Sequence, residues 1–278
     1  MEIPQAHLLP DGQLHLHHGP IDLIVEAFGL GKRAAYERAF RRFGPILGDL
    51  AAELPSLRQD VSLRPPIMDP IGRAMAAAAS RYAPEFVTPM AAVAGAVADA
   101  VLAALVMGEG IEKAYVNNGG DVALFLTPGQ RFSAAIVAEQ SGVFEVSADS
   151  PARGVATSGW RGRSHSLGIA DAVTVLAVDA ATADVAATMI ANAVNLPGHP
   201  AVARTPANLL APDSDLGDRP VTVDVGPLSA VESAAALDAG AAYAGQLLNR
   251  SLILAAALAL NDAICIVGDG GIWQRLQS

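Results

Sequence analysis

The sequence predicts an α+β protein with a largely antiparallel sheet. Runs rich in β-branched residues, such as 173–178, have the composition of strands, whereas 32–54 carries apolar residues at helical spacing. The predicted strands and helices do not alternate regularly, as they would in a parallel α/β fold. A chain of 278 residues is about as long as one hydrophobic core can grow, so one large domain or two closely packed lobes are expected, and we take residues 1–278 as a single domain.

The N-terminal part predicts a hairpin followed by helices. Two alternating runs meet at Gly19-Pro20, which favours a turn between strands. The helix expected over 32–54 contains Gly44-Pro45, which we expect to kink or split it. A second helix is expected at 72–81. A third should start at Thr88-Pro89, because a threonine cap and a proline in the first turn suit a helix start.

The rest of the chain predicts mostly strands. They are expected at 113–116, 122–126, 131–138, 143–146, 173–178, 221–225 and towards the end of 259–267. Helices are expected at 182–195, with Thr182 as its cap and Asp184 in its first turn, and at 229–248. The apolar runs 90–107, interrupted by Asp99, and 251–260 are interpreted as core helices, since neither suits a membrane span.

Composition excludes several classes of function. The net charge is −10 and the basic residues are scattered, apart from Arg38, Arg41 and Arg42, so nucleic-acid binding is not expected. Residues 1–14 carry no signal-peptide pattern, and we expect a cytoplasmic protein that does not span a membrane. The lone cysteine, Cys265, lies in an apolar run and is interpreted as an inert thiol. The alanine-rich helices are compatible with a homodimer, although no self-complementary pattern supports one.

His15 and His17 should share one face of the first hairpin, because alternate residues of a strand point the same way. Paired histidines can hold a metal ion. No carboxylate or thiol stands at an obvious spacing in the sequence, so the interpretation as an ordinary strand surface is favoured.

Three segments carry candidate functional residues. In the first, 117–121, adjacent glycines let the backbone approach a ligand and adopt positive φ. Its candidate binding residues are Asn118, Gly119, Gly120 and Asp121. The alternative for this segment is an ordinary hairpin turn.

The second segment, 154–168, combines glycines and hydroxyls with two arginines. Such a loop can bind an anion through backbone amides and charge-assisted hydrogen bonds. Its candidate binding residues are Thr157, Ser158, Gly159, Arg161 and Arg163, and His165 is a candidate acid or base. The alternative is a mobile surface loop.

The third segment, 183–188, places Asp184 and Thr188 four residues apart on one helix face. A carboxylate and a hydroxyl so placed can supply two oxygens to Mg²⁺, which takes few protein ligands and keeps bound water. An aspartate near a helix start is also common for capping alone.

In this order, the segments resemble the ApbE-like superfamily, the fold of flavin transferases that move FMN from FAD onto a protein threonine. The resemblance is carried by Val116 to Asp121, by Ala156-Thr157-Ser158-Gly159 and by Ala183 to Thr188. The stretches Thr88-Pro-Met-Ala-Ala-Val-Ala-Gly95 and Gly168-Ile-Ala-Asp171-Ala look like the uncharacterised UPF0280 branch.

The resemblance implies a magnesium site made by Asp184, Thr188 and the carbonyl of Ala156, with the other two segments facing a bound nucleotide, FAD or FMN. The transferases continue Thr-Ser-Gly with His-x-x-Asp-Pro-x-Thr-Gly, which this sequence lacks. That departure leaves the FMN-transfer step open, since a fold does not by itself fix an activity.

Three functions follow as hypotheses. The leading one is a divalent-metal-assisted enzyme acting on a phosphorylated or carboxylated small molecule, for which a flavin nucleotide is one candidate. The second is a small-molecule binding protein that has the pocket without the chemistry. The third is a metal-dependent hydrolase in which Asp171 or His165 acts as the base.

Overall fold

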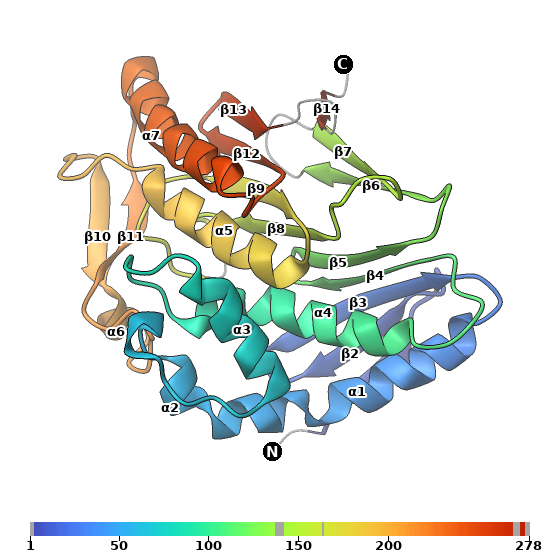
Figure 1. Cartoon of the computed structure of the whole chain (residues 1–278). Helices are drawn as coiled ribbons and strands as arrows, with labels where there is room; N and C mark the ends of the chain where they lie inside the picture. The colour runs from blue at the N-terminus through green and yellow to red at the C-terminus, as the bar shows by residue number, and fades with distance from the viewer. Residues whose placement is uncertain (1–2, 137–141, 163, 269–272, 276–278) are drawn as a thin grey trace. The chain divides into compact units, whose positions relative to one another are not determined.

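The computed structural model describes residues 3–136, 142–162, 164–268 and 273–275. It contains helices and mostly antiparallel sheet, as the sequence predicts (Figure 1). The chain divides into two compact units: residues 1–132, 146–155 and 178–184 form the first, and residues 133–145, 156–177 and 185–278 form the second. The expectation of a single domain over 1–278 stays a prediction.

The first unit is built on antiparallel strands that pair in chain order, and the start of β8 then pairs with β5. The turn at Gly19-Pro20 between β2 and β3 confirms the predicted hairpin. Alternate residues of these strands, such as Leu16, Leu23 and Val25, are fully buried. The strands are β1 (Gln5–Leu8), β2 (Leu14–His18), β3 (Ile21–Phe28), β4 (Lys113–Asn118), β5 (Asp121–Leu126) and β8 (Gly154–Ser158).

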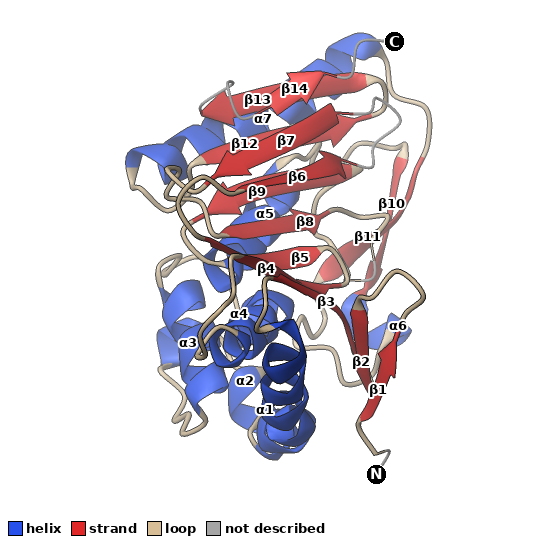
Figure 2. Cartoon of the chain, turned by 90° about the vertical axis from the view of Figure 1, so that its right-hand side faces the viewer, coloured by secondary structure: helices blue, strands red, loops and turns tan. Residues whose placement is uncertain are grey.

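Helices cover the apolar face of these strands (Figure 2). Helix α1 continues through Pro45, so the expected split at this residue is wrong. Phe43 and Ile46 are fully buried on either side of Pro45, and this packing holds both halves of the helix in place. The helices are α1 (Lys32–Ala52), α2 (Leu54–Leu57), η1 (Val61–Leu63), α3 (Pro70–Ser80), η2 (Pro89–Ala92) and α4 (Val93–Leu105).

The second unit contains an antiparallel group of strands in the order β9–β12–β13, with α7 packed on β12 and β13. Two further antiparallel groups are β10–β11 and β14–β7–β6. The strands are β6 (Arg131–Ile136), β7 (Gly142–Ser147), β9 (Ala172–Ala177), β10 (Val202–Pro206), β11 (Pro220–Val225), β12 (Ala255–Leu260), β13 (Ala263–Gly268) and β14 (Trp273–Arg275). The helices are α5 (Ala180–Ala193), of which residues 180–184 belong to the first unit, α6 (Ala207–Leu210) and α7 (Ala230–Asn249).

Two further expectations about elements are wrong. The run 251–260 is not a core helix, because its second half is strand β12, which is buried throughout and pairs with both β9 and β13. A fully buried strand and a buried helix have the same apolar composition, so periodicity does not separate them. Helix α5 starts at Ala180, and Thr182 is therefore inside the helix instead of capping it.

Candidate functional site

The glycine turn between β4 and β5 is a tight hairpin turn attached to the start of α4. Gly119 and Gly120 have φ values of 64° and 114°, a region that favours glycine. The amide of Gly120 donates to Asn117 Oδ1 at 2.9 Å, and Asn118 Nδ2 donates to the carbonyl oxygen of Ala94 at 3.1 Å. The turn predicted from sequence is confirmed, and its second asparagine positions it against α4.

The starts of α4 and α5 are capped reciprocally by an aspartate from the other helix. Asp99 of α4 accepts hydrogen bonds from the amides of Ala180, at 3.1 Å, and Ala181, at 2.9 Å. In return, Asp184 Oδ2 of α5 accepts one from the amide of Gly95 at 3.0 Å. Each carboxylate thus satisfies amides that a helix start leaves unpaired, and lies at the positive end of the other helix's dipole.

Gly95 is what allows the two helix starts to touch. A Cβ atom at this position would lie 2.2 Å from the carbonyl oxygen of Ala180, far inside van der Waals contact. In the sequence, Gly95 belongs to a stretch that carries the family resemblance, and Asp99 interrupts an apolar run. No local pattern predicts either role, because the partners are more than 80 residues away along the chain.

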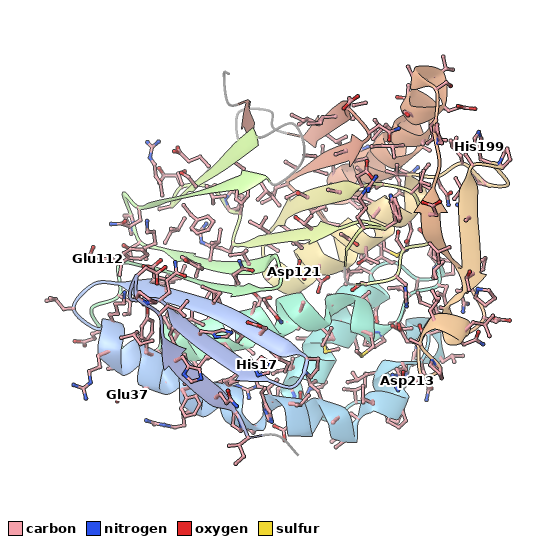
Figure 3. The ribbon with its side chains drawn as sticks, turned by 180° about the vertical axis from the view of Figure 1, so that it is seen from behind. His17, Glu37, Glu112, Asp121, His199 and Asp213 are labelled. Atoms are coloured by element: carbon pink, nitrogen blue, oxygen red, sulfur yellow. The ribbon has the colours of Figure 1, made fainter. Side chains whose placement is uncertain are left out.

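The buried carboxylates near the contact between α4 and α5 are in surroundings that disfavour their charged form. Burial raises the pKa of Asp184 well above its usual range, and the neighbouring charge of Asp121 raises it further, against the smaller effect of the Gly95 and Ala94 amides. Asp121 is itself buried, with 9% of its surface exposed (Figure 3). Burial also raises the pKa of Asp99 to about 6. A cation or a shared proton would relieve this repulsion.

Helix α5 carries two half-buried polar residues on one face. Asp184 and Thr188 lie one turn apart and keep partial exposure, whereas the residues between them, 185–187, are buried. The third residue predicted to bind metal, Ala156, is buried in β8. Among the described residues, no group of three or more His, Cys, Asp or Glu side chains is arranged to hold a metal ion.

The second unit contains the Thr-Ser-Gly segment, held by Asp171. Asp171 Oδ1 accepts hydrogen bonds from Arg161 Nε at 2.6 Å and Trp160 Nε1 at 3.2 Å. Its Oδ2 accepts one from the amide of Asn261 at 2.6 Å. With both oxygens engaged, Asp171 has the contacts of a residue that positions the loop, and its predicted role as a base stays a prediction. Asn261 was not foreseen, because its backbone amide carries no sequence signal.

The other predicted residues of this segment have different surroundings. Thr157 is exposed and its Oγ1 lies 2.9 Å from Thr174 Oγ1, while Ser158 is half-buried. Gly159 packs so closely that a Cβ would lie 2.4 Å from the carbonyl oxygen of Asp171. His165 is exposed. Arg163 lies outside the described residues.

Cys265 is half-buried on β13, and burial raises the pKa of its thiol, with a smaller contribution from Asp238. A raised thiol pKa lowers the fraction of thiolate, the reactive form. This agrees with the interpretation of Cys265 as an inert thiol.

The comparisons with known proteins place the chain among ApbE-like proteins. Residues 6–270 match the family described as AbpE bacteria, and the chain belongs to this family. The chain is 37% identical over 166 residues to a UPF0280 protein of Methanothermobacter thermautotrophicus, a match that covers 55% of this chain and 62% of the relative. It is 38% identical over 130 residues to a UPF0280 protein of Methanothrix thermoacetophila, covering 45% of this chain and 52% of that relative.

These curated relatives are matched over only about half to three fifths of their own length. Within the part of the chain that the structure describes, no helix is long and apolar enough to cross a membrane.

Proposed function

We propose that the protein is a divalent-metal-assisted enzyme that acts on a phosphorylated or carboxylated small molecule. Membership of the ApbE-like superfamily makes a flavin nucleotide, FAD or FMN, the first substrate to test. The observation that supports the proposal most is Asp184, a carboxylate that burial and the charge of Asp121 make costly to ionise. A bound cation would offset that cost.

The residues on α5 and in the turn fit Mg²⁺. Asp184 and Thr188 offer a carboxylate and a hydroxyl from one helix face, and Asp121 brings a second charge close to Asp184. Few protein ligands suffice, because Mg²⁺ usually keeps several water molecules. When bound, the ion would polarise a phosphate or carboxylate oxygen of the substrate.

The remaining residues have proposed roles that need no metal. Asn118 fixes the glycine turn against α4, so that Gly119 and Gly120 present backbone to a ligand. Thr157 and Ser158 offer hydroxyls, and Gly159 keeps the backbone close to Asp171. Asp171 orients Arg161, whose planar guanidinium suits a phosphate or carboxylate.

The direct test is incubation of the pure protein with Mg²⁺ and FAD, followed by measurement of AMP release and of FMN transfer to protein. We expect turnover that is abolished in Asp184→Asn and kept in Asp49→Asn, the same change at an exposed aspartate of α1. If neither AMP release nor FMN transfer is detected, and no flavin binds, a flavin nucleotide is excluded as the substrate. Screening other phosphorylated and carboxylated compounds in the presence of Mg²⁺ then tests the broader proposal.

A binding protein without catalysis is the alternative that one observation favours. Both oxygens of Asp171 are engaged by the loop and by Asn261, which leaves this carboxylate poorly placed to accept a proton from substrate. Native mass spectrometry of the purified protein would detect a retained ligand, and any true turnover contradicts this alternative. The hydrolase version requires that Asp171→Asn or His165→Ala reduce the activity found, and fails if neither does.

A further inference from the structure

One face of the β1–β2–β3 ribbon in the first unit gathers three histidines and an aspartate. His15 and His17 alternate along β2 and so point to the same face. The strand register places His7 of β1 opposite His15, and Asp22 of β3 opposite His17. Residues directly opposite each other in antiparallel strands have Cβ atoms about 4.5–5.5 Å apart. The strand pairing thus supplies the carboxylate that sequence spacing did not show.

The contacts within this cluster are already close. His15 Nε2 lies 2.8 Å from Asp22 Oδ1, and the ring centroids of His15 and His17 are 6.4 Å apart. The side chains of His15 and Asp22 are 28% and 41% exposed, and β1 is exposed along its length. His17 points away from the helices, whereas the adjacent His18 is buried on the other face near Phe43 (Figure 3). An ion can reach the cluster without any opening of the core.

We propose that His7, His15, His17 and Asp22 form a binding site for a transition-metal ion of the Zn²⁺ class. Imidazole nitrogens with a carboxylate oxygen suit Zn²⁺, Cu²⁺ or Ni²⁺, whereas Mg²⁺ prefers an all-oxygen set. The site is therefore chemically distinct from the one at Asp184. His15 and His17, with one residue between them on β2, and His7 across from His15 on β1 bring three imidazole rings to one face of the β1–β2–β3 ribbon.

The side chains must turn for an ion to bind, since among the described residues no group of three or more His, Cys, Asp or Glu side chains is placed to hold a metal ion as it stands. At metal–ligand distances of about 2.0–2.1 Å, two ligand atoms in a tetrahedron are about 3.3 Å apart. The 2.8 Å contact between His15 and Asp22 would open by about half an ångström, and His7 and His17 would rotate towards it. Because these side chains lie on the surface, the rotations leave the buried core unchanged.

The plain alternative is a surface ion pair between His15 and Asp22, which contributes little to stability. The metal site and the ion pair differ in whether all four side chains bind an ion or only His15 and Asp22 contact each other. Isothermal titration of ZnCl₂ into the untagged, chelator-treated full chain separates them. Excess Mg²⁺ in the cell occupies the Asp184 site, so failure of either proposal does not affect the reading of the other.

We expect one Zn²⁺ to bind per chain, and affinity to fall at least about tenfold in His15→Ala and in His17→Ala. His199→Ala, a histidine of the second unit whose Nε2 lies 2.9 Å from Glu232 Oε1, is the control and should bind as the wild type does. His7→Ala weakens binding if all four residues are ligands. Circular dichroism checks that each variant is folded. Absence of stoichiometric binding, or binding that the His15→Ala,His17→Ala double variant leaves unchanged, overturns the proposal.

Discussion

Replacing Asp99 by asparagine should change how the stability of the protein depends on pH. The pKa of Asp99 is raised from 3.8 to about 6, mainly by burial, while its hydrogen bonds from Ala181 and Ala180 act in the opposite direction. Because the folded-state pKa lies above the unfolded one, the stabilising contribution is complete below about pH 3.8 and is lost as pH rises through about 6.

The difference between the two pKa values corresponds to about 3 kcal/mol at most, of which about 1.4 kcal/mol is lost between about pH 5 and pH 8. Asparagine cannot ionise, so Asp99→Asn lacks this loss, although it forfeits one acceptor at the start of α5 at every pH. The free energy of unfolding of the variant, relative to wild type, should therefore rise by about 1.4 kcal/mol over that range.

Urea denaturation of both proteins at intervals across this pH range, with chelator present, measures the change. The comparison cancels the pH dependence of the shared groups that Asp99 does not influence; Asp184, whose pKa the charge of Asp99 also raises, is the exception. A difference in unfolding free energy that stays constant with pH would show that Asp99 does not titrate there, and would refute the argument from burial. A difference that changes in the opposite direction would mean that the helix amides outweigh burial.

Two further changes test packing and the loop. Gly95→Ala should lower the free energy of unfolding by about 1–3 kcal/mol, because its Cβ would overlap the Ala180 carbonyl. The control Gly245→Ala, in α7 with nothing within 4 Å of its Cβ, should be neutral or slightly stabilising. Equal effects of the two changes in chemical denaturation would contradict the close approach of α4 and α5. Asp171→Ala should make trypsin cleave faster after Arg161, since it releases the loop from Asn261, and an unchanged cleavage rate would show that other contacts hold this loop.

Much of the fold was readable because its signals are local. Gly19-Pro20 and the adjacent glycines 119 and 120 need turns, and both lie between paired strands. The long helix α7 was predicted over nearly its full length, and its start carries a capping box between Ser229 and Glu232. Two elements that depend on tertiary contacts were predicted wrongly. Strand β12 was expected to be a helix, because its apolar composition also suits a helix. Helix α1 was expected to kink or split at Pro45, but it passes through this residue because buried residues anchor its two halves.

The residues of the candidate site also fall into two groups, those that local motifs predict and those that only tertiary contacts determine. Asn118, Asp121 and Asp184 were named from motifs, and the structure brings them to one contact in the first unit. Asp99 and Gly95 were missed in this role, because a helix cap supplied by another helix depends on packing that no periodicity records. The engagement of Asp171 by Asn261, 90 residues away, is equally invisible to local pattern.

Binding of Mg²⁺ by the metal-free protein tests the central claim most directly. Isothermal titration of wild type, Asp184→Asn and the exposed control Asp49→Asn should show one ion bound by wild type and control, and at least about a tenfold loss of affinity in Asp184→Asn. Equal Mg²⁺ affinity in all three proteins, or none in any, would mean that the Asp184 carboxylate only caps helix α4.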